Sequence, residues 1–309
     1  YYICYILFIL GVGIVMPIWA DFLETVHLAE RRGSFFGISF AGGSIAGLVG
    51  GFVVNRLIDK PDPVPYIGIG FLIYSACILG AILIFILYRS RPRPAPERAH
   101  SFAQFTSVLK GIMKSDHNFR NYILSRIILT ANYAAIPLYA IHAHDKLDFH
   151  ISEAGIFTAL MVVASGFSSF LAGKIGDRFG HKHAMVISFL AYLGALIAAL
   201  LAETLWHVYL IFIFMGIGKG GFITSAMSLV YEFAGDNDKK IYFALIDSLT
   251  APFVLVAILL SGFFISTGSI PPVLTVIGFI LIAGILALVF LTKEPRTLRE
   301  VPIPREPQP

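Results

Sequence analysis

The chain has 309 residues, of which 57% are hydrophobic and only 14% carry Asp, Glu, Lys or Arg side chains. That composition excludes an ordinary soluble domain and is typical of a protein that lies mostly within a membrane. The net charge of +4 comes from basic residues that form no stripe with interleaved aromatic side chains, so we expect no nucleic-acid partner. Both cysteines, Cys4 and Cys77, lie in apolar runs and favour neither a disulfide framework nor a metal site.

Long apolar runs follow one another along the whole chain. Crossing a hydrocarbon core roughly 30 Å thick takes about 20 mostly apolar residues, and backbone polar groups in lipid must be satisfied within a helix. The sequence therefore predicts an all-α, multi-pass membrane protein with about nine transmembrane helices. The runs lie at roughly 1–22, 34–55, 65–88, 121–142, 153–174, 184–203, 206–231, 241–266 and 271–292.

Lysines and arginines concentrate in alternate connections between these runs. One set of connections, together with the C-terminal tail, holds nearly all of them, whereas the opposite set holds only Arg56, Lys60 and Lys146. Because basic connections stay in the cytoplasm, we expect a cytoplasmic C-terminus and an outward-facing Tyr1. We expect the protein in the cell membrane, plasma or inner.

A basic connection at 89–120 divides the chain. Its start, RSRPRPAPER, is proline-rich and predicts an extended linker. Its second half, SFAQFTSVLKGIMK, places apolar residues on one helical face and predicts a helix lying in the membrane surface, with a loosely ordered loop as the alternative. We therefore predict four parts: a partial helical bundle at 1–88, the linker at 89–120, a six-helix bundle at 121–292 and a tail at 293–309.

The segment GKIGDRFGHK, residues 173–182, resembles the cytoplasmic loop signature of the major facilitator superfamily. His181 stands where that family usually has arginine, and a tight turn that only sets topology is the alternative interpretation. The matching positions are Gly173, Asp177, Arg178, Gly180 and Lys182.

The resemblance implies a role for the aspartate. In the family this residue lies near the start of a helix in the other half, which here is the run that opens at Gly33 and Ser34. A carboxylate at a helix N-terminus is stabilised by about 0.3–1 kcal/mol, and by up to roughly 2 kcal/mol when partly buried. Since that contact exists only while the halves are closed at the cytoplasmic side, we predict that Asp177 is a conformational latch, oriented by Arg178.

The run that opens at Gly33 is similar to the glycine-spaced antiporter signature of the same family, although the proline of that signature is missing. Small residues at this spacing predict close helix packing. Antiport and packing without a coupling role are both open. The packing positions are Gly42, Gly47, Gly50 and Gly51.

Taken over the whole chain, the resemblance covers helices four to twelve of the family's usual twelve. The sequence begins at Tyr1 within an apolar run, so we expect a chain that lacks its first three helices. The family architecture implies two six-helix bundles that rock about a central site.

Lys219 lies near the middle of the run at 206–231, with glycines on both sides that we expect to leave open space. A charge at this depth costs about 2.5–3.5 kcal/mol on insertion scales, so it must face a partner, water or a ligand. By the resemblance this run lines the central cavity. We predict that Lys219 attracts an anionic group of the substrate or releases a proton, and a static pair with a carboxylate is the alternative.

Further ionisable and polar residues lie within other runs. Arg126 and Tyr133 share one helical face, Asn132 occupies the adjoining strip, and Asp247 lies in a later run. We predict that they belong to the substrate or proton pathway, with an Arg126–Asp247 pair that either breaks during transport or is permanent. The histidines of the connection HAHDKLDFH have a spacing that suits a metal, yet a solvated loop is the simpler interpretation, so we predict no metal site.

No nucleophile with a base, metal signature or phosphate-binding loop is evident, so we expect neither an enzyme nor a cofactor. The sequence predicts a secondary transporter, a permease that works as antiporter or symporter. It would move a small anionic or amphiphilic solute by alternating access, coupled to protons or another ion, as a functional monomer. A membrane sensor or scaffold with the same fold and no transport activity is the alternative.

Overall fold

The computed structural model describes Gly11 and residues 32–58, 64–87, 102–147, 153–235, 239–268 and 270–299. These residues are almost entirely helical, and no strand occurs among them. Eight segments of the described ranges are long and apolar enough to cross a membrane. The prediction of an all-α, multi-pass membrane protein is thus confirmed. The first predicted run, at roughly 1–22, lies outside the described residues apart from Gly11, as does the start of the linker.

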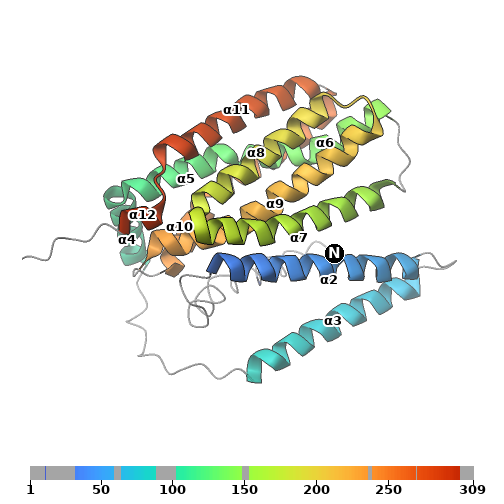
Figure 1. Cartoon of the computed structure of the whole chain (residues 1–309), viewed down its shortest axis with the longest axis horizontal. Coiled ribbons are helices and arrows are strands. Elements are labelled where there is room, and N and C mark those ends of the chain that lie inside the picture. The colour runs from blue at the N-terminus through green and yellow to red at the C-terminus, as the bar shows by residue number, and fades with distance from the viewer. Residues whose placement is uncertain are drawn as a thin grey trace, which may run out of the picture.

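Two helices precede the linker. Helix α2 (Arg32–Ile58) packs lengthwise against α7 (Glu153–Phe179), whereas α3 (Val64–Leu87) diverges from the rest of the molecule (Figure 1). The two packed helices run in opposite directions, so the N-terminus of α2 meets the C-terminus of α7. These ends lie at the left of Figure 1, beside the last helix α12 (Pro295–Arg299). We call this the charged end of the bundle.

The second half of the linker forms the amphipathic helix α4 (Phe102–Ser115). Its Leu109 and Ile112 pack against the core of the bundle, which explains why its apolar residues share one face. Helix α5 (His117–Leu129) then begins at the N-cap Asp116, whose side chain accepts a hydrogen bond of 2.8 Å from the Phe119 amide.

The predicted run at 121–142 lies within one candidate span, His117–Leu147, but the helix of that span is interrupted. The helical segment ends at Leu129, turns at Thr130 and Ala131, and resumes as α6 (Asn132–Leu147). The Thr130 hydroxyl donates to the Ile127 carbonyl at 2.6 Å, and the next amides bond three residues back instead of four. Such shorter bonds tighten and interrupt an α-helix, because side chain and backbone compete for the same carbonyls.

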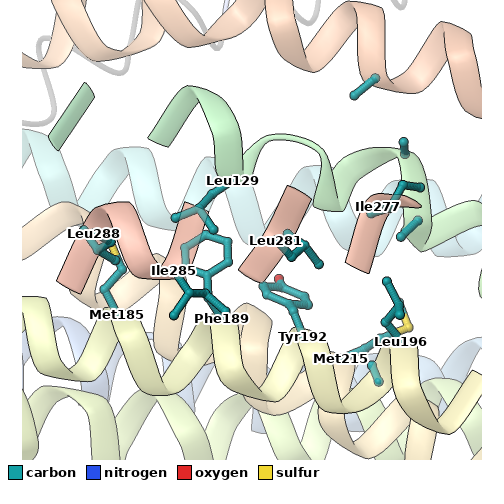
Figure 2. Packing of buried hydrophobic residues seen from close by; sticks show 14 of the residues in the cluster. Leu129, Met185, Phe189, Tyr192, Leu196, Met215, Ile277, Leu281, Ile285 and Leu288 are labelled. Carbon is teal, nitrogen blue, oxygen red and sulfur yellow. The ribbon is translucent and has the colours of Figure 1, made fainter. Parts of the chain in front are cut away.

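The remaining helices surround one apolar core. They are α8 (His181–Leu200), α9 (Leu205–Ala234), α10 (Lys239–Thr267) and α11 (Ile270–Leu291). Figure 2 shows how α8 and α11 interlock through large side chains that recur every three or four residues, the spacing that places them on one helix face. The main contributors are Met185, Phe189, Tyr192 and Leu196 on α8, and Ile277, Leu281, Ile285 and Leu288 on α11.

The seam between α2 and α7 is built from small residues instead. A methyl group added at Gly37 would lie 2.5 Å from the Ser169 carbonyl oxygen, and one added at Gly166 would lie 2.8 Å from the Ser44 Cβ. At the charged end, Gly33 and Gly173 face each other so closely that a side chain on either would collide with the other's backbone. Glycine is required here because the two backbones touch.

The predicted packing glycines behave differently. Within the described part of the chain, no atom lies within 4 Å of a methyl group placed at any of these positions, so the expected close packing is not found there. Glycine spacing indicates where helices can approach but not which face meets a neighbour, and α2 turns another face to α7. The positions concerned are Gly42, Gly47, Gly50 and Gly51.

Candidate functional site

Lys219 lies on α9 with an exposed side chain that lines a cavity of about 300 Å³. The walls come from α2 on one side and from α7 and α9 on the other. Among its described lining residues, Lys219 carries the one charge. Hydroxyl groups of Ser39, Ser44, Ser165 and Ser169 complete the polar part of the lining.

The apolar part of this cavity consists of Phe40, Met161, Val162 and Ile223. Within the part of the chain that the structure describes, Lys219 forms no ion pair with a carboxylate. Its side chain therefore shares the cavity with serine hydroxyl groups and no described carboxylate. Such a site has the means to bind an anion, because a lysine supplies a positive charge with three donors and serines supply further donors.

The glycines beside Lys219 do not leave open space around its stem, contrary to the expectation from the sequence. Gly216 and Gly220 press against the α7 backbone, and Gly218 faces the ring of Tyr192 on α8 at 2.8 Å from a methyl position. These glycines bring α7 and α8 close to α9. The cavity beside Lys219 arises instead on the α2 side, where Gly43 and Gly47 contribute no side chains.

A second cavity, of about 460 Å³, lies between α5, α6, α8, α9 and α10. Arg126 and Asp247 both line it, and Tyr133 lies on the same wall. The Arg126 guanidinium lies 4.5 Å from the centre of the Phe222 ring, close enough for a cation–π contact. Both charged residues are described, and no ion pair within 4.0 Å joins them.

Two details relate these cavities to the sequence predictions. Phe222 lines the second cavity and Ile223 lines the first, so α9 forms a wall of both. Asn132 lines neither of them: its side chain is buried, and its Oδ1 has no hydrogen-bond partner among the described residues. Successive residues of a helix point in different directions, so Tyr133 faces the cavity while Asn132 turns inward.

The carboxylate of Asp177 lies at the N-terminus of α2, the position that the family resemblance implies. Its Oδ1 accepts a hydrogen bond of 3.0 Å from the Gly33 amide, and its Oδ2 accepts one of 2.7 Å from the Ser34 amide. The Ser34 hydroxyl also donates to Oδ2. The first amides of a helix have no partner within it and carry its positive dipole end, so a carboxylate stabilises both.

Arg178 does not orient this carboxylate. It is exposed and lies over the Phe179 ring, 5.1 Å from its centre. The side chain beside Asp177 is His181, which is 1% exposed and whose Nε2 lies 3.6 Å from Asp177 Oδ1. His181 Nε2 also lies 3.9 Å from Glu232 Oε1 on α9, so the imidazole stands between two carboxylates.

A guanidinium from the end of the chain reaches the same place. Arg296 of α12 donates from Nη2 to Glu232 Oε1 at 2.6 Å and from Nη1 to the backbone carbonyl of Asp177 at 2.6 Å. Glu294 contacts the N-terminus of α8, where its Oε2 accepts a hydrogen bond of 3.0 Å from the Lys182 amide. Gly180 occupies the turn between α7 and α8 with φ of 99°, a conformation that favours glycine, and Glu294 fills the space where a side chain would lie.

Sequence reasoning did not single out Glu232, Glu294 or Arg296. Their signal was present: Glu232 is an acidic residue near the end of a 30-residue apolar helix, and the other two directly follow the last apolar run. An acidic residue at a helix end that is otherwise flanked by basic connections needs a partner. Identifying that partner requires knowing that the chain end folds back under α7.

Together these features define a multi-pass helical membrane protein with cavities between its spans and a polar network at one end. Residues 121–309, more than half of the chain, match the Major Facilitator Superfamily. The chain belongs to that superfamily, and the resemblance noted from the sequence is confirmed. It is also similar to the uncharacterized MFS-type transporter YhjO of Bacillus subtilis (strain 168), with 22% identity over 113 residues. That match covers 37% of this chain and 28% of the relative, so this similarity concerns a part of each protein. The comparisons support a membrane transporter and point away from an enzyme.

Proposed function

We propose that this protein is a secondary transporter that moves a small organic solute across the plasma or inner membrane by alternating access. The observation that carries the proposal is the place of Lys219. Its charge lies in a cavity bounded by α2, which precedes the linker, and by α7 and α9, which follow it. A site between helices from both sides of the linker changes its exposure when those helices move apart.

The cavity chemistry supports an anionic or amphiphilic substrate. Lys219 offers a positive charge, the serine hydroxyls offer hydrogen bonds, and one wall is apolar. A carboxylate or another oxyanion on a small apolar body would use all three features. An uncompensated lysine within a membrane span is costly, so a bound anion lowers that cost.

The second cavity supports coupling to protons. Arg126 and Asp247 line the same space without forming an ion pair in this conformation. We propose that they pair in the other half of the cycle, and that Asp247 carries a proton while they are apart. The transport unit is a single chain.

The polar network at the charged end supports the alternation between two states. We propose that the charged end faces the cytoplasm and that the Asp177 contact with α2 is the latch of the cytoplasmically closed state. Opening would leave the first amides of α2 without a hydrogen-bond partner. The contact therefore stabilises the closed state even when no substrate is bound.

The proposal is tested with the full-length protein in lipid vesicles. Uptake of a panel of radiolabelled organic acids, amines and neutral solutes is measured for the parent, Lys219→Ala and Lys219→Arg. We expect uptake of one or more acids, its loss in Lys219→Ala, and partial retention in Lys219→Arg, since only the latter keeps the charge. Lys110→Ala, at an exposed site on α4, is the matched control. Unchanged uptake in Lys219→Ala removes the site, and binding without flux would favour a sensor.

A further inference from the structure

The segment that follows the last span contacts three other parts of the charged end. Lys293 contacts the Asn118 side chain of α5. The Lys293 amide donates to Asn118 Oδ1 at 2.7 Å, and Asn118 Nδ2 donates to the Lys293 carbonyl at 2.9 Å. Glu294 accepts a hydrogen bond from the Lys182 amide at the start of α8. Arg296 then reaches Glu232 on α9 and the Asp177 carbonyl on α7.

These contacts converge on the residue that holds α2. Asp177 faces α2 through its carboxylate and faces Arg296 through its own backbone carbonyl. The guanidinium therefore holds the last turn of α7 through its backbone, while the Asp177 carboxylate stays free to meet α2. Arg296 also forms an ion pair of 2.6 Å with Glu232, and His181 lies between that carboxylate and the carboxylate of Asp177.

We propose that Arg296 is a positioning residue for the latch: by joining the end of α7 to α9, it holds Asp177 where its carboxylate meets the first amides of α2. The segment 292–299 thereby stabilises the closed charged end, although it contacts neither cavity. An arginine suits this role because its planar fork donates to a carboxylate and a carbonyl at the same time. This inference rests on the alternating-access proposal.

The inference requires a readout of the closed state that does not depend on substrate. Phe36 lies on α2 close to the amides that meet Asp177, is 2% exposed and packs against Tyr231 of α9. A cysteine at this position, in full-length protein whose native cysteines are replaced by serine, reacts with maleimide only when α2 moves away from α9 and α7. The rate of labelling in vesicles then reports the open fraction.

We expect Arg296→Gln to increase the labelling rate by about tenfold, the change in an equilibrium constant that follows loss of one charge-assisted hydrogen bond. Arg296→Lys keeps the charge but not the fork, so its rate lies between those of Arg296→Gln and the parent. Lys293→Gln is the matched control, because it removes a charge from the same segment at an exposed side chain, and its rate equals the parent's.

Two further variants separate the possible outcomes. Glu232→Gln removes the same ion pair from α9 and serves if Arg296→Gln does not fold; parental labelling in whichever of the two folds overturns the inference. Asp177→Asn breaks the latch directly. If Asp177→Asn labels faster while Arg296→Gln does not, the positioning role fails and alternating access stands. If neither labels faster, the latch itself and its part in the proposed function fail as well.

Discussion

The carboxylate of Asp177 accepts hydrogen bonds from the amides of Gly33 and Ser34, which lie 144 and 143 residues earlier in the chain. One side chain thus joins the helix that precedes the linker to the bundle that follows it. The contact is between a charge and a helix terminus, not between two side-chain charges. Its strength therefore depends on how α2 is aligned with α7. Among the residues of α2 that the structure describes, the one side chain that takes part is that of Ser34.

Asp177→Asn is expected to weaken this junction by about 1–2 kcal/mol, because the substitution removes the negative charge from the helix N-terminus but keeps the size of the side chain. The open fraction at the charged end rises accordingly, as measured by labelling of a cysteine introduced at Phe36 of α2. Arg178→Gln is the neighbouring control, since Arg178 is exposed and contacts only Phe179 among the partners that the structure gives it. An equal response of both variants would contradict the assignment of the latch to Asp177.

Two glycines of the same helix provide a matched test of the seam. Gly37→Ala places a methyl group 2.5 Å from the Ser169 carbonyl oxygen, and overpacking of this kind costs about 1–3 kcal/mol. Gly42→Ala meets no described atom within 4 Å. Thermal unfolding in detergent is expected to show a lower melting temperature for Gly37→Ala alone. Equal destabilisation would show that Gly42 has a packing partner outside the described residues.

Asp247→Asn is expected to abolish uptake driven by a pH gradient while leaving exchange of labelled for unlabelled substrate intact. The reason is that asparagine keeps the shape of the cavity wall but cannot carry a proton. Proton movement is followed with a pH-sensitive dye enclosed in the vesicles, alongside the substrate. Thr250→Val is the control, because Thr250 lies one turn further along α10 and lines the same cavity. It tests whether removing another polar group from this cavity has the same effect on uptake. Proton-driven uptake that survives in Asp247→Asn assigns coupling to another residue.

Leu281→Ala is expected to lower the free energy of unfolding by about 2 kcal/mol. Leu281 is fully buried between α11 and α8, so its truncation leaves a cavity; the value falls at the lower end for such substitutions because lipid is as apolar as the core. Ile282→Ala, at the next position and 41% exposed, is the control. The comparison uses unfolding in detergent, and equal losses would contradict the packing seen in Figure 2.

The sequence predicts the helices of this protein well because their length and hydrophobicity are set by the thickness of a membrane, a constraint that acts on each span separately. The place of Asp177 beside Gly33 also follows from the family resemblance. Thr130 shows where such reasoning ends. A threonine within an apolar run fits a continuous helix, and only the competition between its hydroxyl and the backbone amides for carbonyls produces the interruption.

The network around Arg296 was missed for a different reason. Its members come from α7, α8, α9 and the chain end, and no spacing rule connects them. The glycines of α2 make the same point, since Gly37 and Gly42 look alike in the sequence and differ only in what lies opposite them. The roles predicted for Lys219, Arg126 and Asp247 stay predictions. The structure places these residues on cavity walls, and their roles are tested by measuring transport in the variants.

The α2–α7 seam, made of backbone and very small side chains, has a kinetic consequence. Helices joined by interlocked leucines and phenylalanines must disengage many rotamers before they can shift. Here Gly33, Gly37, Gly166 and Gly173 carry no rotamers, and the serines between them carry short ones. Tilting along this seam therefore needs little side-chain repacking, so in the proposed switch the resistance comes from the polar contacts at the charged end and from the packing of Phe36 against Tyr231 of α9.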